Sequence, residues 1–351
     1  MIRVKIALLN DTHWSARGDS QIFLDYFMKF FDDVFFPYLK ENDINTIVHA
    51  GDFMDRRKFV NFNSLHQVRT GFIERLKKER IEMHCILGNH DVYYRNTNKV
   101  NSLVELFSDD MIIYEEPQVI NFDGLDIALL PWVNKENYDE SVEFIKTANA
   151  PILIGHLELD GYQVMRGINH QGGMDSKLFN RYEKVLSGHF HCRQEKGNVY
   201  YLGTQYQITF SDLNEKKGFH ILDTDTREVE FIENPHQMFL ETIYNDSEGP
   251  IDVDAINTTN MKDCYVRLIV ESKSHSYSFD RFLDKLYDSG VAKITTVEEI
   301  IDSDKEDEEL LDLAQDTVTL INNEIESIDE VKDKSRMKKL IKDLYMESLS
   351  L

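Results

Sequence analysis

Five short apolar stretches of this sequence each run into residues that bind metal ions or transfer protons. The stretches are residues 7–9, 47–48, 85–87, 152–154 and 185–186, and four of the five are followed closely by a glycine. The residues at their ends are Asp11 and His13, then Asp52, then Asn89 and His90, then His156, and last His189 and His191. Strands carry the residues that follow them to one edge of a sheet, so we expect these side chains to surround one site.

Carboxylate, imidazole and amide groups are hard or borderline ligands, suited to Mn²⁺, Mg²⁺, Fe²⁺ or Zn²⁺. Even without His90, the seven other residues are too many for one ion and fit two ions about 3.5–4 Å apart. Two metal ions acidify a water molecule, hold phosphate oxygens and neutralise developing charge, which suits phosphoester hydrolysis. A single histidine at a strand end is more often structural, but five such strand ends in order favour the metal site. No cysteine has a spacing typical of a zinc finger.

The composition is that of a globular chain of 351 residues, with 42% hydrophobic and 29% charged residues. No run of about 18 apolar residues predicts a membrane span. Three scattered cysteines do not form a disulfide framework and indicate a reducing, cytoplasmic location, which would be the host cytoplasm for a viral protein. The net charge of −24 disfavours DNA binding without excluding it, because residues 298–333 alone carry 15 acidic and two basic side chains.

Hydrophobic periodicity predicts an α/β fold with two packed mixed β-sheets flanked by helices. Helices are expected after a cap at residues 18–20 and over residues 64–80, 100–107 and 142–147. Strands are expected over residues 3–9, 46–50, 81–87, 119–122, 125–130, 152–154, 182–186, 199–202, 219–223 and 229–232. Asp123 and Gly124 predict a hairpin turn between two of these strands.

A composition shift near residue 235 predicts three parts. Residues 1–235 are expected to form the metal-binding domain and residues 236–300 a small α/β capping domain. Residues 301–351 are expected to be an acidic linker followed by two helices, over residues 310–328 and 337–349, with apolar stripes.

These motifs resemble the calcineurin-like metallophosphoesterases, whose set D-x-H, G-D-x-x-D, G-N-H-D/E, G-H and G-H-x-H occurs here in order over residues 1–235. The resemblance implies that one metal ion is held by Asp11, His13 and His191. It implies that a second is held by Asn89, His156 and His189, and that Asp52 bridges the two. Mn²⁺ is the metal that the resemblance implies, with Mg²⁺ as the alternative.

The resemblance implies a different role for His90, which is not a ligand in the family. This histidine faces the scissile phosphate and assists departure of the leaving group. Asp55, three residues beyond Asp52, is expected to accept a hydrogen bond from His90 and to orient it. Asp91 is expected to be a cap or turn residue.

Within this superfamily the sequence is similar to SbcD-type nucleases, with the nearest likeness to the T-even bacteriophage branch. Arg57 and Asp91 stand where protein phosphatases carry glycine and glutamate, which argues against that class. The Leu-Pro-Trp stretch at residues 130–132 and the Leu-Gly-Thr stretch at residues 202–204 are similar to the nucleases. The resemblance implies a DNA exonuclease or endonuclease subunit in double-strand-break processing and recombination.

Two short stretches next to the metal motifs are candidates for DNA contacts. One is Arg56, Arg57 and Lys58, and the other is Tyr93, Tyr94 and Arg95. Solvated loop charges are an equally good interpretation of them. The resemblance also implies that the C-terminal helix pair binds an SMC-like ABC ATPase and that the chain forms a homodimer, for which the helix over residues 64–80 is the candidate.

Two other functions remain open on the sequence alone. A stand-alone nucleotidase or cyclic phosphodiesterase would use the same metal site but would not need the C-terminal helices. A catalytically silent scaffold is disfavoured because no ligand position is missing.

Overall fold

The computed structural model describes residues 5–165, 167–298, 334 and 337. The chain divides into two compact units. Within the described ranges, the large unit comprises residues 5–208 and 214–236, and the small unit comprises residues 209–213 and 237–298. The expected helix pair over residues 310–328 and 337–349 lies outside the described residues, apart from Met337.

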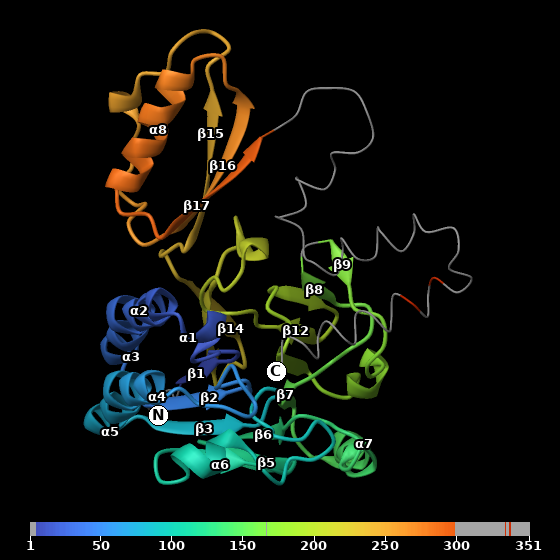
Figure 1. Ribbon diagram of the computed structural model, residues 1–351. Helices are drawn as coiled ribbons and strands as arrows, with labels where there is room; N and C mark the ends of the chain where they lie inside the picture. The colour runs from blue at the N-terminus through green and yellow to red at the C-terminus, as the bar shows by residue number, and fades with distance from the viewer. Residues whose placement is uncertain (1–4, 166, 299–333, 335–336, 338–351) are drawn as a thin grey trace. The chain divides into compact units, whose positions relative to one another are not determined.

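Two six-stranded mixed sheets form the centre of the large unit, so the predicted fold class is confirmed (Figure 1). The first sheet has the order β14-β13-β1-β2-β3-β4 and the second β11-β12-β10-β7-β6-β5. The strands of the first sheet are β1 (Lys5–Leu9), β2 (Thr46–His49), β3 (Glu82–Ile86), β4 (Ile112–Tyr114), β13 (Gly218–Asp223) and β14 (Val229–Glu233). Those of the second are β5 (Gln118–Phe122), β6 (Leu125–Leu130), β7 (Ile152–His156), β10 (Lys184–Gly188), β11 (Gln194–Lys196) and β12 (Val199–Tyr201).

The two sheets pack face to face through the alternate residues of their strands. Ile6 and Leu8 of β1 share one buried apolar cluster with Ile154 of β7 and Leu186 of β10. Successive side chains of a strand point to opposite faces, so the residues between them face the outer layers. This sandwich is held mainly by burial of branched aliphatic side chains.

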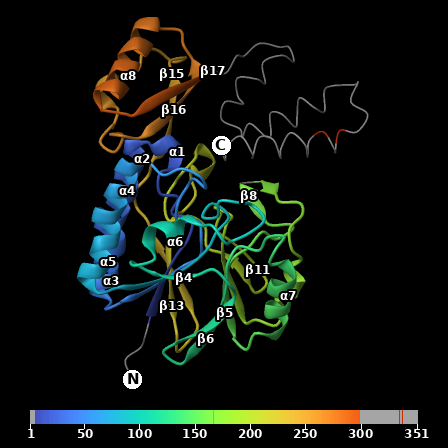
Figure 2. The same ribbon diagram turned by 60° about the horizontal axis from the view of Figure 1, so that its bottom comes forward.

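Helices cover the outer faces of both sheets, as Figure 2 shows for the large unit. They are α1 (Ala16–Asp19), α2 (Gln21–Phe30), α3 (Phe36–Glu41), α4 (Phe62–Val68), α5 (Glu74–Glu79), α6 (Ser102–Phe107) and α7 (Tyr138–Thr147). An aromatic layer packs α2 and α3 onto the first sheet, and in it the ring of Phe27 stacks on Tyr206 at 3.8 Å. On the second sheet, Ile145 of α7 packs with Leu153 and Val185.

The structure differs from the sequence expectations in local detail. The long helices predicted after residue 20 and over residues 64–80 are each interrupted by a π-helical turn, at Phe31–Phe35 and Arg69–Ile73. Periodicity does not reveal these turns, because each adds one residue to the pattern and the apolar stripe is wide enough to accommodate it. The short strands β4, β11, β8 (Gln163–Met165) and β9 (Ile168–Asn169) were not expected.

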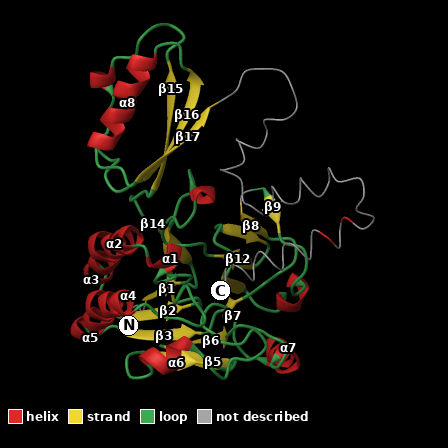
Figure 3. Cartoon of the chain, viewed as in Figure 1, coloured by secondary structure: helices red, strands yellow, loops and turns green. Residues whose placement is uncertain are grey.

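The small unit has a three-stranded parallel sheet covered on one face by a helix (Figure 3). Its elements are β15 (Phe239–Asn245), β16 (Tyr265–Ser272), α8 (Ser276–Asp288) and β17 (Lys293–Glu298). Phe279 and Phe282 of α8 pack on Tyr244 and Leu268 of the sheet. Short 3₁₀ turns lie at Ser176–Phe179 in the large unit and at Phe210–Asp212 and Val253–Ala255 in the small unit.

Candidate metal centre

The five sequence motifs come together where the two sheets meet. β1, β2 and β3 run parallel in the first sheet, and β7 and β10 run parallel in the second. The predicted ligands therefore follow the carboxyl ends of neighbouring strands. His13 and His191 are 178 residues apart in sequence, yet their Nε2 atoms lie 3.1 Å apart.

The first group of ligand-type atoms comprises Asp11, His13 and His191, whose ligand atoms all lie within 4.8 Å of one another. His13 Nε2 lies 3.8 Å from Asp11 Oδ1, and His191 Nε2 lies 3.9 Å from the same oxygen. Asn10 positions the carboxylate by donating from Nδ2 to Asp11 Oδ2 at 2.6 Å.

The second group lies around His156. Its Nε2 is 3.0 Å from Asn89 Oδ1 and 3.3 Å from Asp52 Oδ2. His189 Nδ1 reaches the same Asn89 oxygen at 2.8 Å. The Nδ1 of His156 faces the Ala50 carbonyl at 2.8 Å, which leaves Nε2 as the nitrogen directed into the site.

Asp52 lies between the two groups. Its Oδ2 is 3.3 Å from His156 on one side and 3.8 Å from His13 Nε2 on the other. A carboxylate in this position faces ligand atoms of both groups, which is the arrangement that a bridging ligand requires.

Four of these residues have positive φ angles, which residues other than glycine rarely adopt. Asp11, His13, Asp52 and His189 have φ values of 47°, 43°, 56° and 88°. Such conformations cost of order 1–3 kcal/mol each and persist only where the surrounding structure imposes them. Here they turn the chain sharply after β1, β2 and β10, so that the side chains converge.

The charges of the site fit divalent cations. Burial alone would lower the pKa of His156, but Asp52 and Asp11 raise it to about 9. Burial acts the same way on His13, whose pKa Asp55, Asp52 and Asp11 raise to about 9. Protons on these histidines thus balance buried carboxylates, and a divalent cation that binds here would replace them. The Nε2 atoms of His13 and His191 face each other at 3.1 Å, and imidazole nitrogens and carboxylate oxygens together are ligands that divalent cations accept.

His90 lies beside both groups, and its partner differs from the one expected. Its Nδ1 contacts the backbone carbonyl of Asp55 at 2.5 Å, and its backbone N–H donates to Asp52 Oδ1 at 2.7 Å. The Asp55 carboxylate instead lies 3.2 Å from His13 Nδ1. The expected hydrogen bond from His90 to Asp55 is therefore present, but with the main chain, and the Asp55 side chain orients His13. The cause is the turn after β2, which directs the Asp55 carbonyl and carboxylate to different histidines.

The structure also places His90 within reach of a metal ion. A ring nitrogen of His90, one of His13 and a carboxylate oxygen of Asp52 lie within 4.8 Å of one another. The geometry thus allows His90 either as a ligand or as a group that faces substrate.

Asp91 has a role that the sequence only partly indicated. Its Oδ2 accepts hydrogen bonds from the backbone N–H groups of Asp52 and Gly88, both at 2.8 Å. Its Oδ1 accepts from Phe53 and Met54 at 3.0 and 3.2 Å. Asp91 is a turn residue, as expected, and in addition it joins the loop after β2 to the loop after β3. We refer to these four hydrogen bonds as the Asp91 clamp.

Gly88 is required by this close approach of the two loops. A Cβ at Gly88 would lie 2.2 Å from the Asp52 backbone nitrogen and 2.1 Å from its Oδ1. Any larger residue would push Asp52 out of the site.

The candidate DNA-contacting residues have three different environments. Arg56 forms an ion pair with Asp19 at 3.0 Å, so it is partly neutralised. Arg57 has buried Nε and Nη1 atoms with no hydrogen-bond partner among the described residues. Burial and the neighbouring Arg95 lower the pKa of Arg57, while Asp52 opposes that shift. Lys58 lies over the ring of exposed Tyr93 at 5.8 Å, and that ring contacts Tyr94 at 4.7 Å.

Two features of the site were not recognised as functional from sequence. Trp132 follows β6 and lies against the metal-centre histidines, with its ring 5.3 Å from that of His189. Lys217 is 4% exposed and donates to the His191 carbonyl at 2.9 Å. The Leu-Pro-Trp stretch was the available signal for Trp132, whereas a lone lysine before β13 gives none.

A two-sheet sandwich with Asp, His and Asn side chains gathered at five strand ends defines a class of metal-dependent phosphoesterases. The chain belongs to the calcineurin-like phosphoesterase family, which residues 4–193 match. Among curated proteins it is similar to "Exonuclease subunit 1" of Enterobacteria phage T4, with 31% identity over 98% of this chain and 99% of that protein. It is also similar to a component of the SbcCD nuclease from Staphylococcus saprophyticus (22% identity, 68% of this chain, 61% of that protein) and to its counterpart from Staphylococcus epidermidis (25%, 69% and 72%).

Among solved structures, the chain is similar in part to an archaeal phosphodiesterase, whose whole length matches 66% of this chain with a TM-score of 0.32 and 15% identity. Family membership implies divalent metal ions, for which the Asp and His clusters are the candidate sites. Among the described residues, no helix is both long enough and apolar enough to cross a lipid bilayer.

Proposed function

We propose that this protein is a metal-dependent DNA nuclease that works as a subunit of a nuclease–ATPase complex in double-strand-break processing and recombination. The observation that carries the proposal is the convergence of ligand-type side chains from five strand ends in a chain similar to a phage exonuclease subunit over almost its whole length. The phosphoesterase domain over residues 1–235 would carry the chemistry, and residues 236–300 would form the capping domain.

In this proposal Asp11, His13 and His191 hold one ion, Asn89, His156 and His189 hold the other, and Asp52 contacts both. The distances of 2.8–3.9 Å among their ligand atoms support this division. When bound, the two cations would acidify the attacking water and neutralise charge on the phosphate. Mn²⁺ is the proposed metal, with Mg²⁺ as the alternative, because oxygen and imidazole donors suit both.

His90 is proposed to face the scissile phosphate and to support the leaving oxygen. Its Nδ1 is held at the Asp55 carbonyl, so Nε2 is the nitrogen that remains for substrate. Asp55 acts through two partners, with its carbonyl on His90 and its carboxylate on His13.

Arg57 is proposed to bind a DNA phosphate next to the metal centre. Its buried N–H groups have no partner among the described residues, and a guanidinium left in this state is costly. A phosphate oxygen would satisfy these groups through charge-assisted hydrogen bonds. Arg56, Lys58, Tyr93, Tyr94 and Arg95 are proposed to contact neighbouring phosphates and bases with less effect.

The proposed partner is an SMC-like ABC ATPase that binds the helices expected over residues 310–328 and 337–349. The apolar stripes of these segments support this part of the proposal, as do relatives that are themselves named as parts of larger nucleases. Homodimerisation through the helices over residues 64–80 is proposed as well, and the location is proposed to be the cytoplasm, or the host cytoplasm for a phage protein.

The test is hydrolysis of linear duplex DNA and of a small chromogenic phosphodiester in Mn²⁺ and in EDTA. Wild type and Asp52→Ala are compared, with Asp109→Ala as a control at an exposed aspartate of the same unit. We expect Mn²⁺-dependent DNA cleavage that Asp52→Ala abolishes and Asp109→Ala retains. Cleavage of the small ester but not of DNA, with or without the ATPase, would instead indicate a nucleotidase or cyclic phosphodiesterase.

A further inference from the structure

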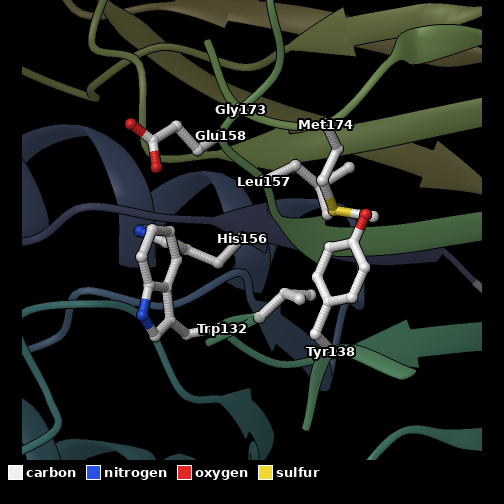
Figure 4. Close-up of a pocket in the computed structure, with 8 residues that line it drawn as sticks. Trp132, Tyr138, His156, Leu157, Glu158, Gly173 and Met174 are labelled. Atoms are coloured by element: carbon white, nitrogen blue, oxygen red, sulfur yellow. The ribbon is translucent and has the colours of Figure 1, made fainter. Parts of the chain in front are cut away.

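A cavity of about 240 Å³ lies beside the candidate metal centre, within the large unit. Its lining includes His156 of the second ligand group together with aromatic and apolar side chains. The residues that line it are Trp132, Val133, Tyr138, His156, Leu157, Glu158, Gly173 and Met174. Figure 4 shows the Trp132 indole and the Tyr138 ring on two sides of this space, with Leu157 between them.

Trp132 is a fixed wall of this cavity. Its backbone N–H donates to the Leu87 carbonyl at 2.8 Å, and its own carbonyl accepts from Asn98 and Asn137 at 3.2 and 3.0 Å. Its ring centroid lies 5.3 Å from that of His189 and 5.9 Å from that of His156. The main chain at Trp132 is therefore fixed before any ligand binds, and the indole lies directly next to two candidate metal ligands.

The rest of the lining combines apolar surface with one carboxylate. Tyr138 is 47% exposed, which is a large exposure for an aromatic residue, whereas Leu157 is buried. The Glu158 side chain is 40% exposed, and its Oε1 lies 3.0 Å from His170 Nε2. A phosphate would be repelled by Glu158, so the lining does not suit the charged part of a nucleotide. Flat apolar faces with a hydrogen-bond acceptor nearby suit an unpaired nucleobase with an amino group.

We infer that this cavity is a subsite for one unpaired nucleobase, which stacks on Trp132 while its adjoining phosphodiester lies at the metal centre. The inference rests on the proposed nuclease function and adds a substrate requirement to it. A base in this cavity is out of the duplex stack, so the enzyme acts on a single strand or on a frayed end. Removing base–aromatic stacking weakens binding between about 5- and 150-fold.

The test uses single-stranded oligonucleotides with one cleavable phosphodiester, all other linkages being protected as phosphorothioates. In two further substrates, the nucleoside on the 5′ or the 3′ side of the cleavable bond is abasic. The values of kcat/KM in Mn²⁺ are measured for wild type, Trp132→Ala and Trp132→Phe. Tyr277→Ala serves as a control, because Tyr277 is an aromatic residue of the small unit with 78% exposure.

If the inference is correct, Trp132→Ala loses at least about fivefold in kcat/KM on the intact oligonucleotide, and one of the two abasic substrates shows the same loss with wild type. Trp132→Ala acting on that abasic substrate then shows no lower kcat/KM than either change alone, and Trp132→Phe restores most of the activity. If instead the loss from Trp132→Ala and the loss from the abasic site multiply, the two act independently and the inference is wrong. So would a loss of Mn²⁺ affinity in Trp132→Ala by calorimetry, since Trp132 would then only support the histidines.

Binding without turnover gives a second readout. The chain has two tryptophans, and Trp14 is fully buried. We therefore expect an oligonucleotide added in EDTA to quench tryptophan fluorescence in wild type and not in Trp132→Phe. Equal quenching in both proteins would contradict base stacking at Trp132. If wild type cleaves no oligonucleotide either alone or with the ATPase, the proposed nuclease function fails and the subsite inference falls with it.

Discussion

The Asp91 clamp gives the sharpest test of how this fold positions its site. Four backbone N–H groups from two loops converge on one carboxylate, two on each oxygen, at 2.8–3.2 Å. This arrangement requires acceptors on both oxygens. Asp91→Asn keeps the size and shape of the side chain but replaces one oxygen with an NH₂ group. Two N–H groups in the buried loops then lose their acceptor and face another donor.

The size of the effect follows from the cost of buried unsatisfied donors. Each buried N–H without an acceptor costs about 1–3 kcal/mol, so two cost about 4 kcal/mol. For a unit of this size each kcal/mol shifts the unfolding midpoint by roughly 2–4 °C, so we expect a decrease of roughly 8–16 °C. Since one of the donors belongs to Asp52 itself, we also expect weaker Mn²⁺ binding.

Thermal unfolding by circular dichroism in EDTA measures the structural effect, and calorimetric titration with Mn²⁺ measures the effect on the site. Asp109→Asn is the matched control, because it makes the same chemical change at an exposed position. An Asp91→Asn protein that unfolds within about 2 °C of this control would refute the reasoning. So would a large loss of stability without any change in Mn²⁺ affinity, because the clamp would then not position Asp52.

Three further predictions concern single side chains of the large unit. His90→Ala is expected to retain Mn²⁺ and DNA binding while kcat falls about 10²- to 10⁴-fold, since proton transfer to the leaving group is lost; loss of Mn²⁺ binding by calorimetry would make His90 a ligand. Arg57→Ala is expected to weaken DNA binding about tenfold or more and to reduce the slope of log K against log salt by about 1. Arg57→Lys should restore only part of the affinity. Arg227→Ala, at a surface position, should change neither the affinity nor the slope. Burial, with a smaller effect of Arg193, lowers the pKa of His220 to about 3. Below about pH 6.5, His220 therefore binds a proton in the unfolded chain but not in the folded chain. In wild type, the free energy of unfolding should therefore fall by up to roughly 1.4 kcal/mol per pH unit between pH 6.5 and 3, and His220→Phe should remove this decrease. Urea unfolding at pH 7 and 5 measures the difference. Equal pH dependence in both proteins would show that His220 is protonated in the fold.

Much of the architecture follows from local pattern. The alternation in β1 places Ile6 and Leu8 on the inner face of the sandwich, and the apolar runs before Asn89, His156 and His189 form β3, β7 and β10. A strand needs only its own period of two to define its faces. The π-helical turns were not predictable from the same pattern, because the aromatic stripe of residues 23–38 is wide enough to accommodate an extra residue.

The contacts among the site residues could not be predicted from local pattern in the same way. Asp55 was expected to orient His90 through its side chain, and the fold instead gives that carboxylate to His13. The clamp of Asp91 and the position of Trp132 against His189 likewise depend on loops that approach one another only after the sheets pack.

The sequence by itself determined the longer strands of the two sheets, the order of the ligand-type residues and the family to which they belong. These depend on hydrophobic period and on residues close together in the chain. Only the tertiary structure decided which atom faces which, as for the nitrogens of His13 and His191, 178 residues apart and 3.1 Å from each other. The reason is physical: hydrogen bonds and metal sites are sensitive to differences of tenths of an ångström in the distances between separate segments, and packing of the two sheets sets those distances.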